Sequence, residues 1–313
     1  MRCPSERWKL GTRGSPLALW QAEWVAGQLK AENSGLEMEI EIVKVRTLAE
    51  KFPDREVAEI GVGIFTRELD EALLRGDIDF AVHSLKDIPT EVDPRLEITA
   101  VPTRESPFDA FISADGTTLA RLPIGARIGT GSPRRRAQLL CARPDLEIVP
   151  LRGNVATRLR KMEEERLAGT ILAHAGLKRL DEERRITEVL SCSVIMPAVS
   201  QGALAVVACR DAARLISRLK RLDHPPSRTC VLSERAFLRR LRGGCQVPAG
   251  ALGTLRAGKT LHLQGIVAAL DGSAWVRGEL TGAAEAAEEL GIRLANDLLE
   301  RGGEEILAAL GRS

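Results

Sequence analysis

The chain has 313 residues, of which 44% are hydrophobic and 28% are charged. This length and composition predict an ordinary soluble globular protein of about two domains, and three small domains also fit. The formal net charge is only +2, tyrosine is absent, and aromatic residues make up 3% of the chain. These values argue against a polycation and against a platform that stacks nucleic-acid bases.

Positive charge is concentrated in one stretch. Between Arg127 and Lys161, nine Arg or Lys residues stand against two acids, a local charge of +7. This unevenness favours a localised anion site over a surface that binds nucleic acid everywhere. No signal peptide is visible in residues 1–10, and no segment approaches the ~18 apolar residues of a membrane span. The six cysteines are never closer than 15 residues apart. The lack of a CxxC pair disfavours a zinc ribbon and predicts reduced, cytoplasmic thiols and no metal.

A strand, a turn and a helix start occur twice in similar form. The turns are Gly11–Pro16 and Gly129–Pro133, and each ends in Ser-Pro, a hydroxyl that caps free amides followed by a residue suited to the first helical position. The second helix then opens with Arg134, Arg135 and Arg136. Three cations at the positive end of a helix dipole cost stability. They therefore suggest a negatively charged ligand at this turn.

The predicted elements alternate as in βαβ units with a mostly parallel sheet. The first unit begins with a helix that starts at Leu17 and ends within 27–33, followed by a strand at 38–45 and a loop at 47–63. A helix at 64–74, ended by Gly76, and a strand at 78–82 come next. A second unit has strands at 127–128, 148–149 and 171–173, with helices after the turns at 129–133 and 152–154. Residues 196–207 return to the first domain, and 224–226 read as a linker. The tail is a small α+β domain with a hairpin around Asp271-Gly272 and two closing helices.

Six arginines lie at or near strand-to-helix junctions: Arg13, Arg134, Arg135, Arg152, Arg158 and Arg179. Arginine suits bidentate recognition of carboxylate or phosphate. Carboxylate is favoured because no phosphate-binding glycine loop accompanies them. For any single arginine, a solvated basic face is the alternative interpretation.

Two further residues can carry chemistry. Asp87 follows an apolar strand beside Lys86, where a carboxylate could move protons or stabilise a cationic intermediate, or simply cap a helix. Cys245 lies in a loop sequence with two glycines before it and a proline soon after. A thiol there could act as a nucleophile or covalent anchor, although free cysteines are often packing residues.

Five short runs are spread in order over nearly the whole chain: residues 12–21 (TRGSPLALWQ), 83–89 (HSLKDIP), 151–155 (LRGNV), 175–180 (AGLKRL) and 243–248 (GGCQVP). Together they resemble the signatures of the hydroxymethylbilane synthase family, also called porphobilinogen deaminase. The resemblance implies an α/β fold with two doubly wound lobes of the type II periplasmic-binding-protein kind and a small α+β C-terminal domain. We place lobe 1 at residues 1–102 and 199–221, lobe 2 at 103–198 and the cofactor-carrying domain at 222–313.

The resemblance also implies a reaction. The family's transferase adds four porphobilinogen units head to tail onto a dipyrromethane primer, releasing ammonia each time, and water then frees hydroxymethylbilane for tetrapyrrole biosynthesis. The cysteine that holds this cofactor by a thioether matches Cys245, and the catalytic aspartate matches Asp87. The residues that match the family's cofactor- and substrate-binding motifs are Arg13, Ser15, Lys86, Thr130, Ser132, Arg134, Arg135, Arg152, Asn154, Arg158 and Arg179. The implied partners are porphobilinogen and a uroporphyrinogen-III synthase that takes the product, with the chain a cytoplasmic monomer that binds neither nucleic acid nor membrane.

Two departures from the family pattern are visible. Residues 60–65 read IGVGIF, one residue shorter than the usual Gly-Gly-Lys-Gly loop before Leu-Phe and without its lysine, and Pro133 stands where leucine is common. They leave open a degenerate, non-catalytic two-lobed protein that binds a small carboxylate. A nucleic-acid binder is a third alternative.

Overall fold

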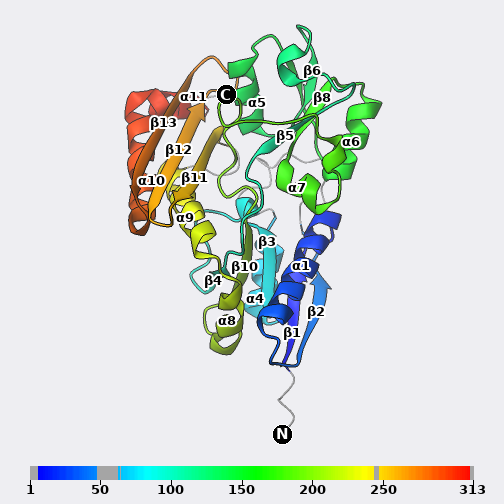
Figure 1. Cartoon of the computed structure of the whole chain (residues 1–313), viewed down its shortest axis with the longest axis vertical. Coiled ribbons are helices and arrows are strands. Elements are labelled where there is room, and N and C mark those ends of the chain that lie inside the picture. Colours follow the sequence, from blue (N-terminus) through cyan, green and yellow to red (C-terminus); the bar gives the residue numbers. More distant parts are fainter. Residues whose placement is uncertain (1–5, 48–62, 64, 243–246, 311–313) are drawn as a thin grey trace. The chain divides into compact units, whose positions relative to one another are not determined.

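The computed structural model describes residues 6–47, 63, 65–242 and 247–310, which contain three β-sheets (Figure 1). Its contacts divide the chain into two compact units. Unit 1 holds residues 1–105 and 203–228, and unit 2 holds residues 106–202 and 229–313. Within the described ranges, no helix is long and apolar enough to cross a membrane.

Unit 1 is built on a five-stranded sheet with the order β2-β1-β3-β10-β4. Its strands are β1 (Glu6–Thr12), β2 (Met38–Lys44), β3 (Phe80–Ser84), β4 (Leu96–Ala100) and β10 (Leu204–Cys209). Strand β1 is parallel to β2 and β3, whereas β10 is antiparallel to β3 and β4. The predicted return of the chain to the first domain is found at residue 203, just before β10, whereas residues 196–202 belong to unit 2.

The helices of unit 1 are α1 (Pro16–Glu32), α4 (Arg67–Arg75) and α8 (Ala213–Leu219), with short turns η1 (Leu85–Asp87) and η4 (Lys220–Leu222). Val25 and Leu29 of α1 are buried in one cluster with Leu10 and Phe80 of the sheet. Gly76 ends α4 with φ +76°, as predicted. The predicted loop at 47–63 falls almost entirely outside the described residues.

Unit 2 contains a second five-stranded sheet with the order β7-β6-β8-β5-β9. Its elements are β5 (Asp109–Ser113), β6 (Arg127–Gly129), β7 (Glu147–Val149), β8 (Gly169–Ala173), β9 (Glu188–Val189), α5 (Pro133–Ala142), α6 (Val155–Glu164), α7 (His174–Arg179), η2 (Leu119–Arg121) and η3 (Glu183–Arg185). The strand order matches that of unit 1, with β6 at the position of β1 and β5 at the position of β10. The directions match as well, because β6 is parallel to β7 and β8 and β5 is antiparallel to β8. Two α/β lobes with the same winding are therefore confirmed.

The third sheet is antiparallel and belongs to unit 2, with the order β11-β12-β13. Its elements are β11 (Ala249–Arg256), β12 (Thr260–Ala268), β13 (Trp275–Ala283), α9 (Pro225–Arg240), η5 (Ala284–Ala286), α10 (Ala287–Leu298), the π-type turn η6 (Leu299–Gly303) and α11 (Glu304–Leu310). Helices α9 and α10 cover one face, because a Cβ on Gly265 would lie 2.9 Å from the Phe237 ring and 3.2 Å from Leu294 (Figure 1). The small α+β domain is confirmed.

The prediction of a linker at 224–226 is wrong, because two of these three residues are helical. Pro225 and Pro226 begin helix α9, where proline is tolerated because the first amides of a helix have no partner within it. The boundary between the two units nevertheless falls two residues later, at Arg228. The three-domain boundaries expected from the sequence stay a prediction.

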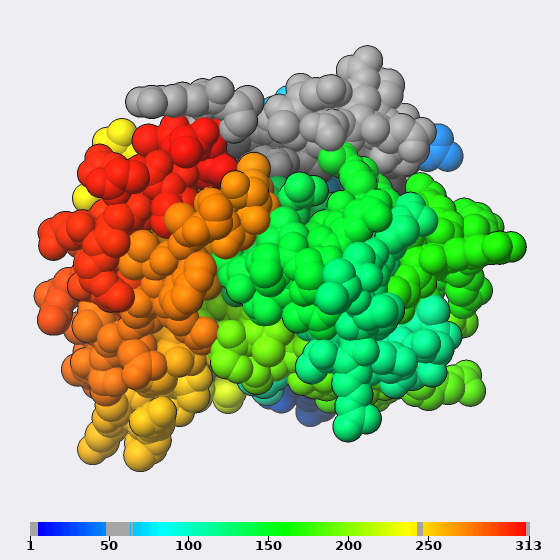
Figure 2. Space-filling model, turned by 90° about the horizontal axis from the view of Figure 1, so that it is seen from above, coloured from blue at the N-terminus to red at the C-terminus, as the bar shows by residue number. Residues whose placement is uncertain are grey.

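Within unit 2, the hairpin between β12 and β13 packs against helix α5. Gly272 has φ +74°, and a Cβ there would lie 2.6 Å from the backbone carbon of Leu140. Arg136 of α5 donates from Nε to the Leu270 carbonyl at 3.3 Å. In Figure 2 the orange and red C-terminal segments lie beside the green segment that contains α5. The third arginine of the triplet therefore holds this hairpin.

Candidate functional site

The turn after β1 begins helix α1 as the sequence predicts. Ser15 is the N-cap, and its Oγ accepts a hydrogen bond from the Ala18 amide at 3.3 Å. Pro16 follows in the first turn of α1, and Thr12 Oγ1 donates to the Ala18 carbonyl at 3.0 Å. These two bonds fix the backbone on both sides of Arg13.

A small pocket in unit 1 lies at this turn. It is lined by Arg13, Ser15, Leu17, Ala18, Gln21, Phe65, Val82, His83, Ser84 and Asp87. The guanidinium carbon of Arg13 lies 4.8 Å from the centre of the Phe65 ring, within the range of a cation–π contact. Gln21 Nε2 donates to Ser84 Oγ at 3.0 Å and so joins α1 to the end of β3. Three predicted residues, Arg13, Ser15 and Asp87, are thus brought together.

Asp87 is placed by the end of β3. The strand passes into η1, whose first amide, that of Leu85, donates to the Ala203 carbonyl at 3.0 Å. Asp87 ends η1, is half-buried and lines the pocket, whereas Lys86 beside it is not among the lining residues. A carboxylate and a guanidinium that share a pocket can hold a ligand with both N–H and carboxylate groups.

His83 is one of the polar residues of this pocket to which our sequence analysis assigned no role. It is 5% exposed, and its Nε2 atom is buried with no hydrogen-bond partner in the described part of the chain. Burial and the positive charge of Arg13 lower the pKa of His83 to about 4. The imidazole is therefore neutral at physiological pH.

The turn after β6 has the same construction in unit 2. Ser132 is the N-cap of α5, and its Oγ accepts from the Arg135 amide at 3.4 Å. A Cβ on Gly131 would lie 3.0 Å from the Leu151 carbonyl oxygen and 3.3 Å from Arg152 Cγ, so glycine lets this turn pack against the turn after β7. The predicted residues Thr130, Ser132 and Arg152 consequently lie on neighbouring turns.

Helix α6 starts at the second of these turns. Asn154 is its N-cap and accepts from the Thr157 amide at 2.8 Å. Arg158, one turn into the helix, donates from Nε to the Gly153 carbonyl at 2.7 Å. Both predicted residues therefore also have local structural roles.

Arg134 and Arg135 are buried and share one carboxylate, that of Asp109. Arg134 Nη1 lies 2.7 Å from one oxygen of Asp109, and Arg135 Nη2 lies 2.7 Å from the other. Burial alone would raise the pKa of Asp109, but the two guanidinium groups outweigh it and hold that pKa well below its usual range. Two cations against one anion leave a net charge of +1 in a place shielded from water. Asp109 is thus a counter-charge that the sequence analysis missed.

Gln201 and Gly202 connect this pair to a further predicted arginine. Gln201 Nε2 donates to Asp109 at 3.1 Å and to the Pro107 carbonyl at 2.8 Å. Arg179 Nη2 donates to the Gly202 carbonyl at 2.8 Å. The arginines at positions 134, 135 and 179 are therefore tied to one buried network in unit 2.

Some of the missed residues left a signal in the sequence. Asp109 is a single acid beside apolar residues at the start of a strand, and an acid in such a place is rarely buried unless it is paired. His83 stands in the run 83–89 that carries the resemblance. Phe65 is the last residue of the run 60–65, which differs from the family pattern, and nothing in that run indicated a cation–π contact.

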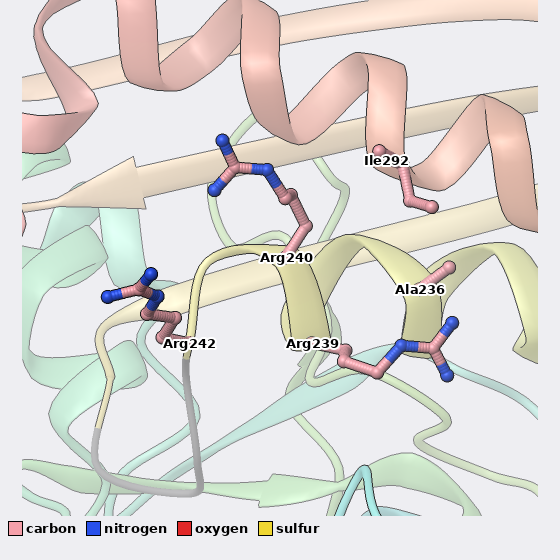
Figure 3. Close-up of a pocket in the computed structure, with 5 residues that line it drawn as sticks. All are labelled: Ala236, Arg239, Arg240, Arg242 and Ile292. Atoms are coloured by element: carbon pink, nitrogen blue, oxygen red, sulfur yellow. The ribbon is translucent and has the colours of Figure 1, made fainter.

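A second hollow, of about 410 Å³, lies in unit 2 between α9 and α10 (Figure 3). It is lined by Ala236, Arg239, Arg240, Arg242 and Ile292. Arg239 donates to Glu288 at 3.0 Å, and Arg240 and Arg242 are exposed. Arg242 is the last described residue before 243–246, so the predicted anchor Cys245 lies outside the described residues.

Among the described residues, no group of three or more His, Cys, Asp or Glu side chains is arranged to hold a metal ion.

Comparison with known families and proteins gives one consistent result. The family described as "Porphobilinogen deaminase, dipyromethane cofactor binding domain" matches residues 8–218, and "Porphobilinogen deaminase, C-terminal domain" matches residues 228–300. The porphobilinogen deaminase of Syntrophotalea carbinolica is 48% identical over 303 residues, which are 96% of this chain and 95% of the relative. That of Pelotomaculum thermopropionicum is 49% identical, over 95% of each chain.

Solved structures give weaker likenesses. The methionine-binding protein MetQ has a TM-score of 0.42 and 15% identity, covering 69% of this chain and 89% of its own. The VFT2 domain of BvgS from Bordetella pertussis has a TM-score of 0.39 and 15% identity, covering 70% of this chain and 86% of its own.

Proposed function

This chain belongs to the porphobilinogen deaminase family, and on that premise we propose which of its residues carry out the family's reaction. The enzyme joins four porphobilinogen units head to tail on a dipyrromethane cofactor, releases ammonia at each addition and frees hydroxymethylbilane by hydrolysis. The alternative of a non-catalytic carboxylate-binding protein is not favoured, because both family domains match and relatives of this name cover nearly the whole chain.

The proposed ligand residues fit a cofactor rich in carboxylates. The observation that carries this assignment is the buried Arg134–Asp109–Arg135 group, whose net charge of +1 favours an anion nearby. We assign Arg134, Arg135, Arg152, Arg158 and Arg179 of unit 2 and Arg13 of unit 1 to the acetate and propionate side chains of cofactor and growing chain. Polar contacts would come from Ser15, Lys86, Thr130, Ser132 and Asn154. When bound, dipyrromethane supplies the free pyrrole end to which units are added.

Asp87 is the proposed catalytic residue. Loss of ammonia from porphobilinogen leaves an electron-poor azafulvene, and a carboxylate fixed beside it stabilises the developing positive charge. The same carboxylate can accept and return the proton of a pyrrole N–H. Its position at the end of η1, held by the bond from Leu85 to Ala203, keeps it at the pocket that also contains Arg13.

Cys245 is the proposed point of attachment, and an intact-mass measurement tests it. Purified protein should be heavier than its chain by one dipyrromethane and should give the colour reaction of pyrroles with Ehrlich's reagent. Cys245→Ala should lose both signals, whereas the matched control Cys192→Ala, at a half-buried cysteine, should keep them. An adduct that survives in Cys245→Ala would refute the assignment.

The role of Asp87 is tested by turnover. Asp87→Asn should reduce ammonia release from porphobilinogen by about a hundredfold or more while the protein stays folded and keeps its adduct. Asp79→Asn, also in unit 1 but with its carboxylate on the exposed Lys9 amide, is the control. Normal ammonia release by Asp87→Asn would exclude a catalytic role.

We further propose that the enzyme is a cytoplasmic monomer that passes hydroxymethylbilane to a uroporphyrinogen-III synthase. Size-exclusion chromatography with light scattering tests the oligomeric state. A coupled assay tests the hand-off, because a direct transfer should resist a trap for free hydroxymethylbilane in solution.

A further inference from the structure

His83 lines the same pocket as Arg13 and Asp87. It is one of four histidines in the chain and lies near the end of β3. The backbone pairs with Ala205 of β10, so the position of the residue is fixed inside the sheet. Its side chain is 5% exposed, and its Nε2 atom makes no hydrogen bond to any described residue. A buried polar atom without a partner destabilises a fold, so such a group points to a function.

Strands β1 and β3 lead Arg13 and His83 to the same pocket. Strands β1 and β3 are parallel, with Leu10 opposite Phe80 and Gly11 opposite Ala81. Strand β1 ends at Thr12, and Arg13 follows it into the turn that lines the pocket together with His83. The charge of Arg13 also contributes to the lowered pKa of His83, as expected for close neighbours. The guanidinium lies over the Phe65 ring, which limits its movement.

A neutral imidazole beside a guanidinium offers one further N–H donor. A carboxylate has two oxygens and only accepts hydrogen bonds, so it can be bound by both groups at once. Porphobilinogen and the chain grown from it carry such carboxylates on every ring.

We propose that Nε2–H of His83 donates a hydrogen bond to the substrate carboxylate that Arg13 binds. His83 is then a binding residue that orients a pyrrole ring toward Asp87 and takes no part in proton transfer. This inference rests on the proposed role of Arg13 and extends it to a two-donor carboxylate site.

Three substitutions separate this proposal from a packing role. Glutamine can place an amide N–H near the position of Nε2, asparagine reaches only near Nδ1, and leucine keeps the volume without a donor. His83→Gln should keep a KM for porphobilinogen close to that of the unchanged enzyme. His83→Asn and His83→Leu should raise KM about tenfold or more with a smaller change in kcat, because a binding contact is lost. His83→Leu should also unfold at an equal or higher temperature, because it removes an unpartnered polar atom.

The same experiment identifies which proposal fails. If the unchanged enzyme releases no ammonia from porphobilinogen, the proposed function is refuted. If it releases ammonia and all three variants share its KM, or if glutamine is as harmful as leucine, only the role of His83 is refuted.

Nuclear magnetic resonance of ¹⁵N-histidine-labelled holoenzyme gives a readout that does not depend on the variants. Addition of porphobilinogen to the Asp87→Asn holoenzyme should move the Nε2 signal of His83 to that of a protonated, hydrogen-bonded nitrogen and raise the pKa of the ring. An unchanged Nε2 signal at saturating porphobilinogen would overturn the proposal.

Discussion

Asp109 lies 2.7 Å from Nη1 of Arg134, and both side chains are almost fully buried in unit 2. The same carboxylate also accepts two hydrogen bonds from Arg135, from Nε at 3.1 Å and from Nη2 at 2.7 Å. One anion thus orients two guanidinium groups in the first turn of α5, where cations are unfavourable. The group therefore carries one more positive charge than negative charge.

Asp109→Asn should destabilise the protein strongly. Removing one partner of a buried ion pair leaves an uncompensated charge and costs about 3–5 kcal/mol. The free energy of unfolding, measured by chemical denaturation near neutral pH, should fall by about this amount. Asp77→Asn, which breaks the exposed Arg75–Asp77 pair, is the control and should change little.

The loss of stability caused by Asp109→Asn should become smaller as the pH falls. The pKa of Asp109 is lowered in the folded protein, so its contribution is complete above the unfolded value of about 3.9. It is lost as pH falls through the folded value. The difference between the two proteins should therefore shrink below about pH 4, and a difference that grows there would contradict this account.

The docking of the C-terminal hairpin on α5 can be tested at Gly272. Gly272→Ala places a Cβ 2.6 to 2.7 Å from the backbone of Leu140 and Cys141 and also forces alanine to adopt φ +74°. The free energy of unfolding should fall by about 1 kcal/mol because of the positive φ and by a further ~1–3 kcal/mol because of the clash.

Gly258→Ala is the matched control for the hairpin. Gly258 has φ +70° in the other hairpin of the same sheet, and a Cβ at this position would have no atom of a described residue within 4 Å other than those of its chain neighbours. Gly258→Ala should therefore lower the free energy of unfolding only by the cost of a positive φ, about 1 kcal/mol. Equal losses of unfolding free energy in the two variants would mean that the hairpin does not pack tightly on α5.

Local signals in the sequence predicted most of the framework. Ser15 and Ser132 cap the helices that Ser-Pro marked, Gly76 ends α4, and Asp271-Gly272 forms the hairpin turn. What could not be predicted depends on pairing between distant segments. Asp109 meets Arg134 because β5 returns antiparallel beside β8, and a register of that kind has no local signature. For the same reason, the burial of His83 beside Arg13 was not foreseen.

Asp70 on α4 should respond to pH in the direction opposite to Asp109. Burial raises its pKa to about 6, and the negative charges of Asp93 and Glu71 add to this. A raised carboxyl pKa stabilises the fold below the unfolded value of about 3.9, and this contribution is lost as pH rises through about 6. Asp70→Asn should therefore increase the free energy of unfolding near pH 7.5 by about 1–2 kcal/mol, allowing for partial exposure. The gain should vanish near pH 4; a gain that is independent of pH would exclude this cause.

His83 should make the protein less stable in mild acid. Its pKa is about 4 when folded and about 6.5 when unfolded, so between these values the unfolded chain binds the extra proton. Stability is then complete above about pH 6.5 and falls by about 2–3 kcal/mol as pH approaches 4. His83→Gln, which cannot titrate, should show a flatter decline over this window when the free energy of unfolding is measured at several pH values. His262→Gln is the control, because that half-buried histidine belongs to unit 2 and lies 3.3 Å from Glu279. If His83→Gln loses stability as steeply as the unchanged protein, His83 is not neutral in the fold and cannot serve as the uncharged donor proposed for it.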